Sequence, residues 1–311
     1  MVLPVLTLLL SILWMPPTFM TFTGNILNMS RRKIQVAHEA PLALMPLVRH
    51  FTDYDYALVH LFEDSDQAFA KEYYHFFETS LKRGRRVILD NSVFELGEAF
   101  DLEKFFEWVY KLQPTEYIIP DALEDYPGTI KRVDDWFRLV EQKAAEGKVL
   151  KSKSIGVCQG KTYADLFLCY RELSYKVDKI AVSFDCSCYL EHFPYKSKEE
   201  AFMNGRRFFM TGLRRRFRTG ALKEKPMHLL GCFLPQEFVY YKESPDFSFI
   251  ETLDTSNPVV HGLIRKKYEE DGLHEKCMTK LVTFMKLPST AITDTQKAVI
   301  FSNITKFKNW I

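Results

Sequence analysis

The chain has 311 residues, of which 47% are apolar and 26% are charged, the balance of an ordinary folded protein. This composition excludes a disordered chain, a fibrous protein and a small disulfide-stapled domain. The 42 lysines and arginines nearly match the 40 acidic residues, so any attraction to nucleic acid must come from a local basic patch.

The first 29 residues differ from the rest. Residues 2–15 form an apolar run, VLPVLTLLLSILWM, which is short for a membrane span and lacks the basic start of a secretory signal. A cleaved or anchoring segment, an extension upstream of the true start and a packed arm are the three interpretations. We favour the extension, with residues 30–311 as one catalytic domain. We expect a cytoplasmic protein (in the host cytoplasm if phage-encoded) without stable membrane association.

From Lys33 onward, short apolar runs alternate with longer segments whose apolar residues recur every three or four positions. The runs expected to be strands are KIQVA (33–37), YALVHLF (56–62), RVILDN (86–91), EYIIPD (116–121), KSIGVCQ (153–159), KIAVSFD (179–185), HLLGCF (228–233) and FSFIETLD (247–254). Strands alternating with helices predict an α/β fold with a parallel sheet, and eight of them suit a closed (β/α)8 TIM barrel. An open doubly wound sheet is the alternative.

A long basic connection separates the sixth and seventh runs, and we interpret residues 186–227 as an insertion in the barrel. It is either a solvated helix face or a grip on a phosphate backbone, because arginines and phenylalanines alternate in it. The candidate backbone contacts are Arg206, Arg207, Arg214, Arg215, Arg216 and Arg218.

The six cysteines are scattered, and several lie inside apolar runs, so we expect buried reduced thiols. Cys186, Cys188 and His192 have the wrong spacing for a zinc site, and we predict no metal. The sequence has neither a Walker loop nor a Rossmann glycine fingerprint, and no cofactor is expected.

Polar residues that can carry chemistry stand at the ends of four predicted strands: Asp90, Asp121, Gln159 and Asp254. A single carboxylate there usually caps the next helix, but the ends of parallel barrel strands converge in one cup. Two carboxylates flanking a sugar carbon permit glycosyl transfer with retention, while a carboxylate and an amide can read a purine edge. Binding of Mg²⁺ through oxygen ligands is an alternative.

These strand ends resemble the tRNA-guanine transglycosylase superfamily, especially its shorter phage and bacterial relatives that insert 7-deazaguanines into DNA. VILDNSVFELG is similar to the family's third-strand motif, which implies that Asp90 is the general acid/base. YIIPDALEDYP is similar to the fourth-strand motif and implies that Asp121 reads the guanine edge. SIGVCQG resembles the G-x-x-Q-G strand, implying Gln159 on the base carbonyl and close backbone approach at Gly160.

The resemblance continues to residue 262. IAVSFD implies a pocket lining by Ser183 and Phe184, and HLLGCFLPQEF implies that Gly231 lies under the base. FIETLDTSNPVVHG is similar to the strand that carries the nucleophile, implying Asp254. An extruded guanine would then be replaced by a 7-deazaguanine such as preQ0 through a covalent aspartyl–sugar intermediate.

The sequence departs from the tRNA-modifying members in four ways. Ser92 and Val93 replace a Gly-Gly pair, the family's zinc motif is missing, and no RNA-binding domain follows. The arginines after the nucleophile are also replaced, by Val259, Val260 and His261. These departures favour DNA over tRNA as the partner.

Three other functions stay open from the sequence. A hydrolytic glycosylase would use the same cup with water in place of the incoming base. A non-catalytic barrel would only bind nucleic acid through residues 206–225. An unrelated sugar- or phosphate-processing barrel enzyme would ignore nucleic acid.

Overall fold

Eight parallel strands form one sheet in the computed structural model, which describes residues 33–191, 197–275 and 279–311. The strands are β1 (Gln35–His38), β2 (Asp55–Leu58), β3 (Val87–Asp90), β4 (Glu116–Ile118), β5 (Lys153–Cys158), β6 (Lys179–Ser183), β7 (Met227–Leu230) and β8 (Ile250–Thr255). Their order is β1-β8-β7-β6-β5-β4-β3-β2, so the sheet curls into a nearly closed barrel. Each of the eight apolar runs therefore contains a strand, although residues 59–62 of the second run form the 3-10 helix η3 instead. The apolar segment 1–29 lies outside the described residues.

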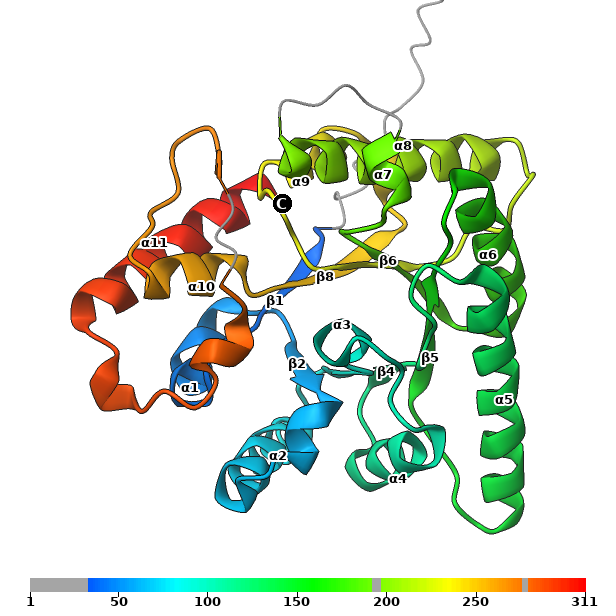
Figure 1. Ribbon diagram of the computed structural model, residues 1–311, viewed down its shortest axis with the longest axis horizontal. Helices are drawn as coiled ribbons and strands as arrows, with labels where there is room; N and C mark the ends of the chain where they lie inside the picture. The colour runs from blue at the N-terminus through cyan, green and yellow to red at the C-terminus, as the bar shows by residue number, and fades with distance from the viewer. Residues whose placement is uncertain (1–32, 192–196, 276–278) are drawn as a thin grey trace, which may run out of the picture. The chain divides into compact units, whose positions relative to one another are not determined.

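Helices follow the strands and lie outside the sheet, as Figure 1 shows for α2, α4, α5 and α6. The α-helices are α1 (Met45–Val48), α2 (Gln67–Lys82), α3 (Val93–Leu96), α4 (Leu102–Leu112), α5 (Tyr126–Ala145), α6 (Tyr163–Lys176), α7 (Cys188–Glu191), α8 (Lys198–Arg218), α9 (Glu237–Lys242), α10 (Asn257–Leu263) and α11 (Asp294–Trp310). The 3-10 helices are η1 (Leu42–Leu44), η2 (Arg49–Phe51), η3 (Val59–Glu63), η4 (Pro245–Phe247), η5 (Leu281–Phe284) and η6 (Ser289–Ala291). No helix in the described ranges has the length and apolarity needed to cross a membrane.

Side-chain caps fix where the long outer helices begin. Asp66, Asp101 and Asp125 each accept a hydrogen bond from a backbone N–H in the first turn of α2, α4 and α5. Thr162 and Asp165 form a reciprocal capping box at the start of α6. Such caps satisfy amides that a helix leaves unpaired, so the chain turns from strand to helix at defined positions.

The segment between β6 and β7 is mostly helix. After the short α7, α8 runs for 21 residues and buries Phe209, Met210 and Leu213. It occupies the place in the chain of the helix that joins two parallel strands. In the described part of this connection the structure therefore shows a crossover helix and no separate insertion.

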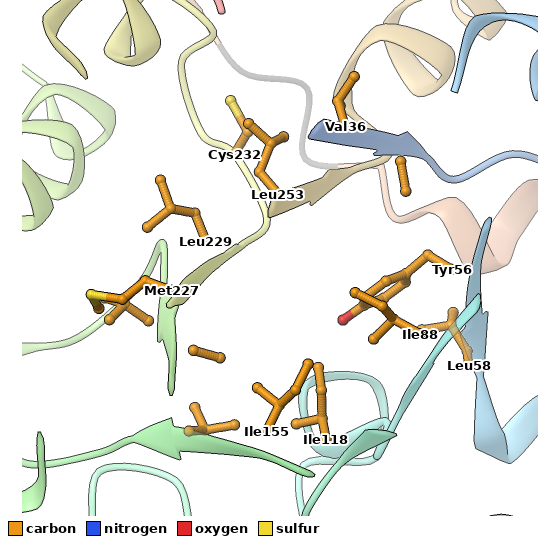
Figure 2. Packing of buried hydrophobic residues seen from close by; sticks show 14 of the residues in the cluster. Val36, Tyr56, Leu58, Ile88, Ile118, Ile155, Met227, Leu229, Cys232 and Leu253 are labelled. Carbon is orange, nitrogen blue, oxygen red and sulfur yellow. The ribbon is translucent and has the colours of Figure 1, made fainter. Parts of the chain in front are cut away.

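The barrel interior is filled by inward-facing side chains. Tyr56 is paired with Ile88, and Ile118 with Ile155, across neighbouring strands, and Figure 2 shows these four residues within the ring of strands. At the amino-terminal end of the barrel, Lys179 lies 3.0 Å from a Glu116 oxygen. Apolar packing and this ion pair fill that end of the barrel.

The two ends of the sheet, β1 and β2, meet at a seam. In the described chain these two strands form no ladder, and Asp53 joins them instead. Its backbone N–H donates to the Val36 carbonyl (2.8 Å), and its carboxylate accepts from the Val36 N–H (2.9 Å). Two hydrogen bonds made by one residue, Asp53, thus take the place of a backbone ladder.

Candidate active site

The four strand-end residues all lie at the carboxyl-terminal end of the barrel. Asp90 is the last residue of β3, Gln159 follows β5, and Asp254 is the fifth residue of β8. Asp121 follows β4 after two residues. Between 3% and 8% of each residue is exposed, so all four are shielded from bulk solvent. The structure divides them into two hydrogen-bonded groups.

The first group is built around Asp121. The Gln159 side-chain amide donates to one of its oxygens (2.6 Å), and the Asn91 amide donates to the other (2.7 Å). The carbonyl oxygen of Gln159 accepts from the Glu124 backbone N–H (2.9 Å). Burial raises the pKa of Asp121 although both amides favour its charged form. The group presents an acceptor and an amide side by side, which suits the edge of a polar heterocycle.

The second group joins Asp90 to Asp254 across the barrel. Tyr56 donates its hydroxyl to Asp90 (2.9 Å), and His228 Nε2 lies 3.0 Å from Asp254. The Tyr56 and His228 rings stack with centroids 5.8 Å apart and an angle of 18° between their planes. Each of the two carboxyl groups is therefore bonded to one ring of the same aromatic stack.

Asp90 lies at a tight turn. Its second oxygen accepts from the Ser92 N–H (2.7 Å), and Ser92 has the left-handed backbone angle φ 59°. Burial and the negative charge of Glu95 raise the pKa of Asp90, while the hydrogen bonds from Ser92 and Tyr56 lower it. The net effect is a raised pKa, which favours the protonated form of Asp90.

His228 is neutral, because burial lowers its pKa. Its Nδ1 lies 2.9 Å from the Thr252 hydroxyl. A carboxylate only accepts, so the ring proton lies on Nε2 and points at Asp254, while Nδ1 accepts from Thr252. The Gly231 N–H adds a donor at 3.3 Å from each Asp254 oxygen. Asp254 is thus fixed by neutral donors.

Two glutamates in the cup were missed from the sequence. Glu39, one residue after β1, shares a hydrogen bond with Asp254, and its pKa is raised by burial and by the charge of Asp254. Glu95, on α3, has its pKa raised to about 7, first by burial and then by the charge of Asp254. Glu39 follows the predicted strand 33–37 by two residues, so the pattern of an acid just after a strand could have found it. The position of Glu95 depends on the turn at Ser92.

The predicted lining residues lie next to this cup. Phe184 packs edge-on against Phe233, with centroids 4.8 Å apart, and its other face meets the exposed Phe94. A Cβ on Gly231 would lie 2.4 Å from the Phe184 ring, so this position requires glycine. Ser183 donates to Asp185 (2.6 Å).

Gly160 lies where the loop after β5 meets the start of α6. A Cβ at this position would lie 2.5 Å from the Asp165 Cβ. Its carbonyl oxygen also accepts from the Cys186 thiol (3.3 Å). Glycine therefore brings this loop close to α6 and to the loop after β6.

The arginines of α8 mostly contact the protein itself. Arg206 is fully buried and forms a two-point ion pair with Glu237, so its guanidinium is not available to a phosphate, and we withdraw it from the backbone contacts. Arg207 donates to the Gln236 carbonyl, and Arg216 lies 3.6 Å over the Phe167 ring.

The remaining three arginines of α8 lie nearer to solvent. Arg214 and Arg218 pair with Asp246, at 3.4 and 2.6 Å. Arg215 is exposed. Of the six arginines, Arg215 and Arg218 present the most open surface to a partner.

The thiols and candidate metal ligands lie in different parts of the chain. The five cysteines within the described ranges are free and buried, as predicted, and the Cys186 and Cys188 sulfur atoms are 2.8 Å apart. His192 and Cys277 lie outside the described residues. Within those ranges, the group with metal-ligand spacing is Glu269, Asp271 and His274, all exposed.

No protein-family model matches the chain, and no curated protein matches it either. The site must therefore be interpreted from its own geometry.

Proposed function

We propose that the protein is a glycosyltransferase of the guanine transglycosylase type. It would exchange guanine in a nucleic acid, with DNA favoured over tRNA, for a 7-deazaguanine base such as preQ0. The observation that carries the proposal is the pair of Asp90 and Asp254, buried carboxyl groups that are each bonded to one ring of the Tyr56–His228 stack. Two carboxyl groups on either side of a sugar carbon are what a retaining glycosyl transfer requires.

In the first half-reaction, Asp254 attacks C1′ of the sugar and the bond from C1′ to guanine breaks. The leaving guanine takes the proton held by Asp90, a role that the raised pKa of Asp90 supports. In the second half-reaction, the 7-deazaguanine gives its proton to Asp90 and attacks C1′. The ester bond breaks, Asp254 leaves as a carboxylate, and two inversions retain the configuration.

The base would be recognised by the group around Asp121. An extruded guanine has ring N–H and amino donors for a carboxylate and a carbonyl acceptor for an amide N–H. Asp121 and Gln159 offer these groups 2.6 Å apart. The Phe184 ring, which lies on Gly231, would supply an apolar surface against the flat base.

The test is base exchange. The full chain is incubated with radiolabelled guanine or preQ0 and either duplex DNA or tRNA, and label in the polymer is counted. Asp254→Asn should lower exchange by about 10³-fold or more and abolish the covalent adduct on a denaturing gel, because the amide is a poor nucleophile. Asp101→Asn is the matched control, since asparagine caps α4 as well as aspartate.

Each of the other outcomes would indicate a different function for the protein. Exchange by Asp254→Asn at the rate of the unmutated protein would overturn the assignment of Asp254. Abasic sites without incorporation would indicate a glycosylase. Binding of nucleic acid without any chemistry would indicate a non-catalytic barrel, and no interaction with either polymer would indicate a sugar- or phosphate-processing enzyme.

A further inference from the structure

Glu39 extends the pairing of β1 with β8 beyond the strand. Ala37 is in register with Asp254, and the Glu39 N–H donates to the Thr255 carbonyl (3.1 Å). Side chains two residues apart on a strand face the same side, so Glu39 lies one step above Ala37 on the inner face. This backbone register, fixed by β8 itself, brings the Glu39 carboxyl group to Asp254.

The surroundings of Glu39 are acidic and enclosed. It shares a hydrogen bond with Asp254, and two carboxyl groups can do so only when one of them is protonated. Asp254 already accepts from His228 and Gly231, which favours its charged form, so the proton belongs to Glu39. The ionisable groups around Glu39 come from several elements. They are Asp254 on β8, Asp90 on β3, Glu95 on α3, His38 on β1, Arg49 on η2, Tyr54 just before β2, and Asp55 and Tyr56 on β2.

A cavity of about 20 Å³ borders Glu39 at the seam between β1 and β2. Tyr54 and Tyr56 are among the residues that line it. This volume holds about one water molecule. The cavity gives the glutamate proton a route of exchange with solvent that does not pass through the base pocket.

We propose that Glu39 is a positioning residue for Asp254: its carboxylic acid donates a hydrogen bond that holds Asp254 as the attacking group and then as the leaving group. This inference rests on the proposed function. When Asp254 forms the ester, its charge disappears, and the O–H of Glu39 then faces a neutral oxygen. When the ester breaks, the electron pair returns to Asp254, and the same O–H, with the N–H groups of His228 and Gly231, stabilises it. Glu39 keeps its proton throughout, while Asp90 exchanges protons with the bases.

The proton on Glu39 can be observed without any substrate. Infrared pH titration of the full chain should show carboxylic-acid C=O absorption near neutral pH, and the difference spectrum against Glu39→Gln should isolate one band of it, because other acids of the cup with a raised pKa, such as Glu95, absorb there as well. In Asp254→Asn that band should be lost at a lower pH than in the unmutated protein, because the neighbouring charge that holds the proton is gone. A band that is unchanged at neutral pH in Glu39→Gln would overturn the inference, as would a band in Asp254→Asn that titrates at the original pH.

Exchange activity tests the consequence for catalysis. Glu39→Ala should lower the rate by about 10²-fold, the usual loss when one donor to a developing charge is removed. Glu39→Gln keeps a donor that does not titrate, so it should retain most activity, and its loss of rate at alkaline pH should be less steep. Equal rates and identical pH profiles in all three proteins would overturn the positioning role. If the infrared results are as expected but the unmutated protein exchanges no base, the proposed function is wrong. The hydrogen bond between the Glu39 and Asp254 carboxyl groups is then still supported.

Discussion

Glu95 is an acid of the cup whose protonation changes near neutral pH. It lies on the short helix α3, half-buried, and one of its carboxyl oxygens is buried without a hydrogen-bond partner. Burial and the charge of Asp254 raise its pKa to about 7, while Lys280 lowers it. Unfolding exposes the carboxyl group to water and restores an ordinary pKa near 4.5.

This difference predicts how stability depends on pH. Between pH 4.5 and about 7 the folded state binds the Glu95 proton more tightly than the unfolded state, so the contribution of Glu95 is lost as pH rises through this range. Glu95→Gln should therefore gain stability relative to the unmutated protein between pH 5 and pH 8, measured by urea denaturation at both values. Glu98→Gln, a substitution of an exposed glutamate in the same loop, is the control. A constant difference between Glu95→Gln and the unmutated protein would contradict the assignment.

At the residue scale, the sequence reveals the strand-end aspartates but not the side chains that hydrogen-bond to them. Asp90 and Asp254 end apolar runs, and that pattern alone places them at one end of a barrel. Tyr56 and His228 lie inside predicted strands, where an aromatic or polar residue has no visible role until the opposite strand is known. The stack between them joins β2 to β7, and no local pattern contains that contact.

At the element scale, Arg206 connects the long helix α8 to the site. Besides its ion pair with Glu237 on α9, it donates to the carbonyl oxygens of Leu230 (2.9 Å) and Gly231 (3.1 Å). Gly231 in turn directs its N–H at Asp254. A buried arginine on an outer helix therefore fixes the loop that holds the reactive carboxylate.

Replacing Arg206 by methionine should destabilise the protein by about 3–5 kcal/mol, because Glu237 would remain buried without its partner. Arg215→Met, on the exposed side of the same helix, should change stability by no more than about 0.5 kcal/mol. Denaturant unfolding of both variants measures this contrast.

If Arg215 contacts a phosphate, its loss should also make nucleic-acid binding less dependent on salt. The slope of log affinity against log salt concentration should become smaller by about one. Equal stability of Arg206→Met and Arg215→Met would contradict the structural role of Arg206.

The charge pattern of α8 is where sequence reasoning went furthest from the structure. Its arginines form a run that suggests a surface for phosphate, but Arg206 and Arg216 bond to neighbouring elements. Which arginine faces solvent depends on what packs against the helix, and the local sequence of the helix does not contain that information. A second difference concerns residues 59–62, which were predicted as strand. The strand β2 ends at Leu58, and these residues form the 3-10 helix η3.

At the scale of the whole molecule, the two ends of the barrel carry opposite arrangements of charge. The carboxyl-terminal end gathers acids, whereas the amino-terminal end balances them with cations. Lys179 is 3% exposed and pairs with Glu116 (3.0 Å) and Glu251 (3.1 Å), and Glu116 also bonds to Arg86. Burial alone would raise the pKa of Glu116, but Lys179 and Arg86 lower it overall.

Lys179→Met should therefore destabilise the fold by about 3–5 kcal/mol, because it leaves Glu116 buried with one cation fewer. The double variant Lys179→Met/Glu116→Gln should recover part of this loss, since the uncompensated charge is removed. Urea denaturation of the two variants measures the recovery. A double variant that is less stable than the sum of the single effects predicts would contradict this account.

The barrel itself was predictable because each strand carries its own apolar run and each helix its own period, and eight strands suit closure. The contact that joins the two ends of the sheet was not predictable, because Asp53 and Val36 lie in segments that read as ordinary loop and strand.

That seam has a consequence for how water reaches the acids. A sheet with two free edges opens most easily where the edges meet, because fewer hydrogen bonds must break there than in a continuous ladder. Glu39 follows one edge strand and Tyr56 lies on the other. A brief local opening at Asp53 would thus bring water to the half-buried Glu39 from the side of the barrel. The seam that joins the two ends of the sheet is therefore also a place where an acid of the cup can exchange protons.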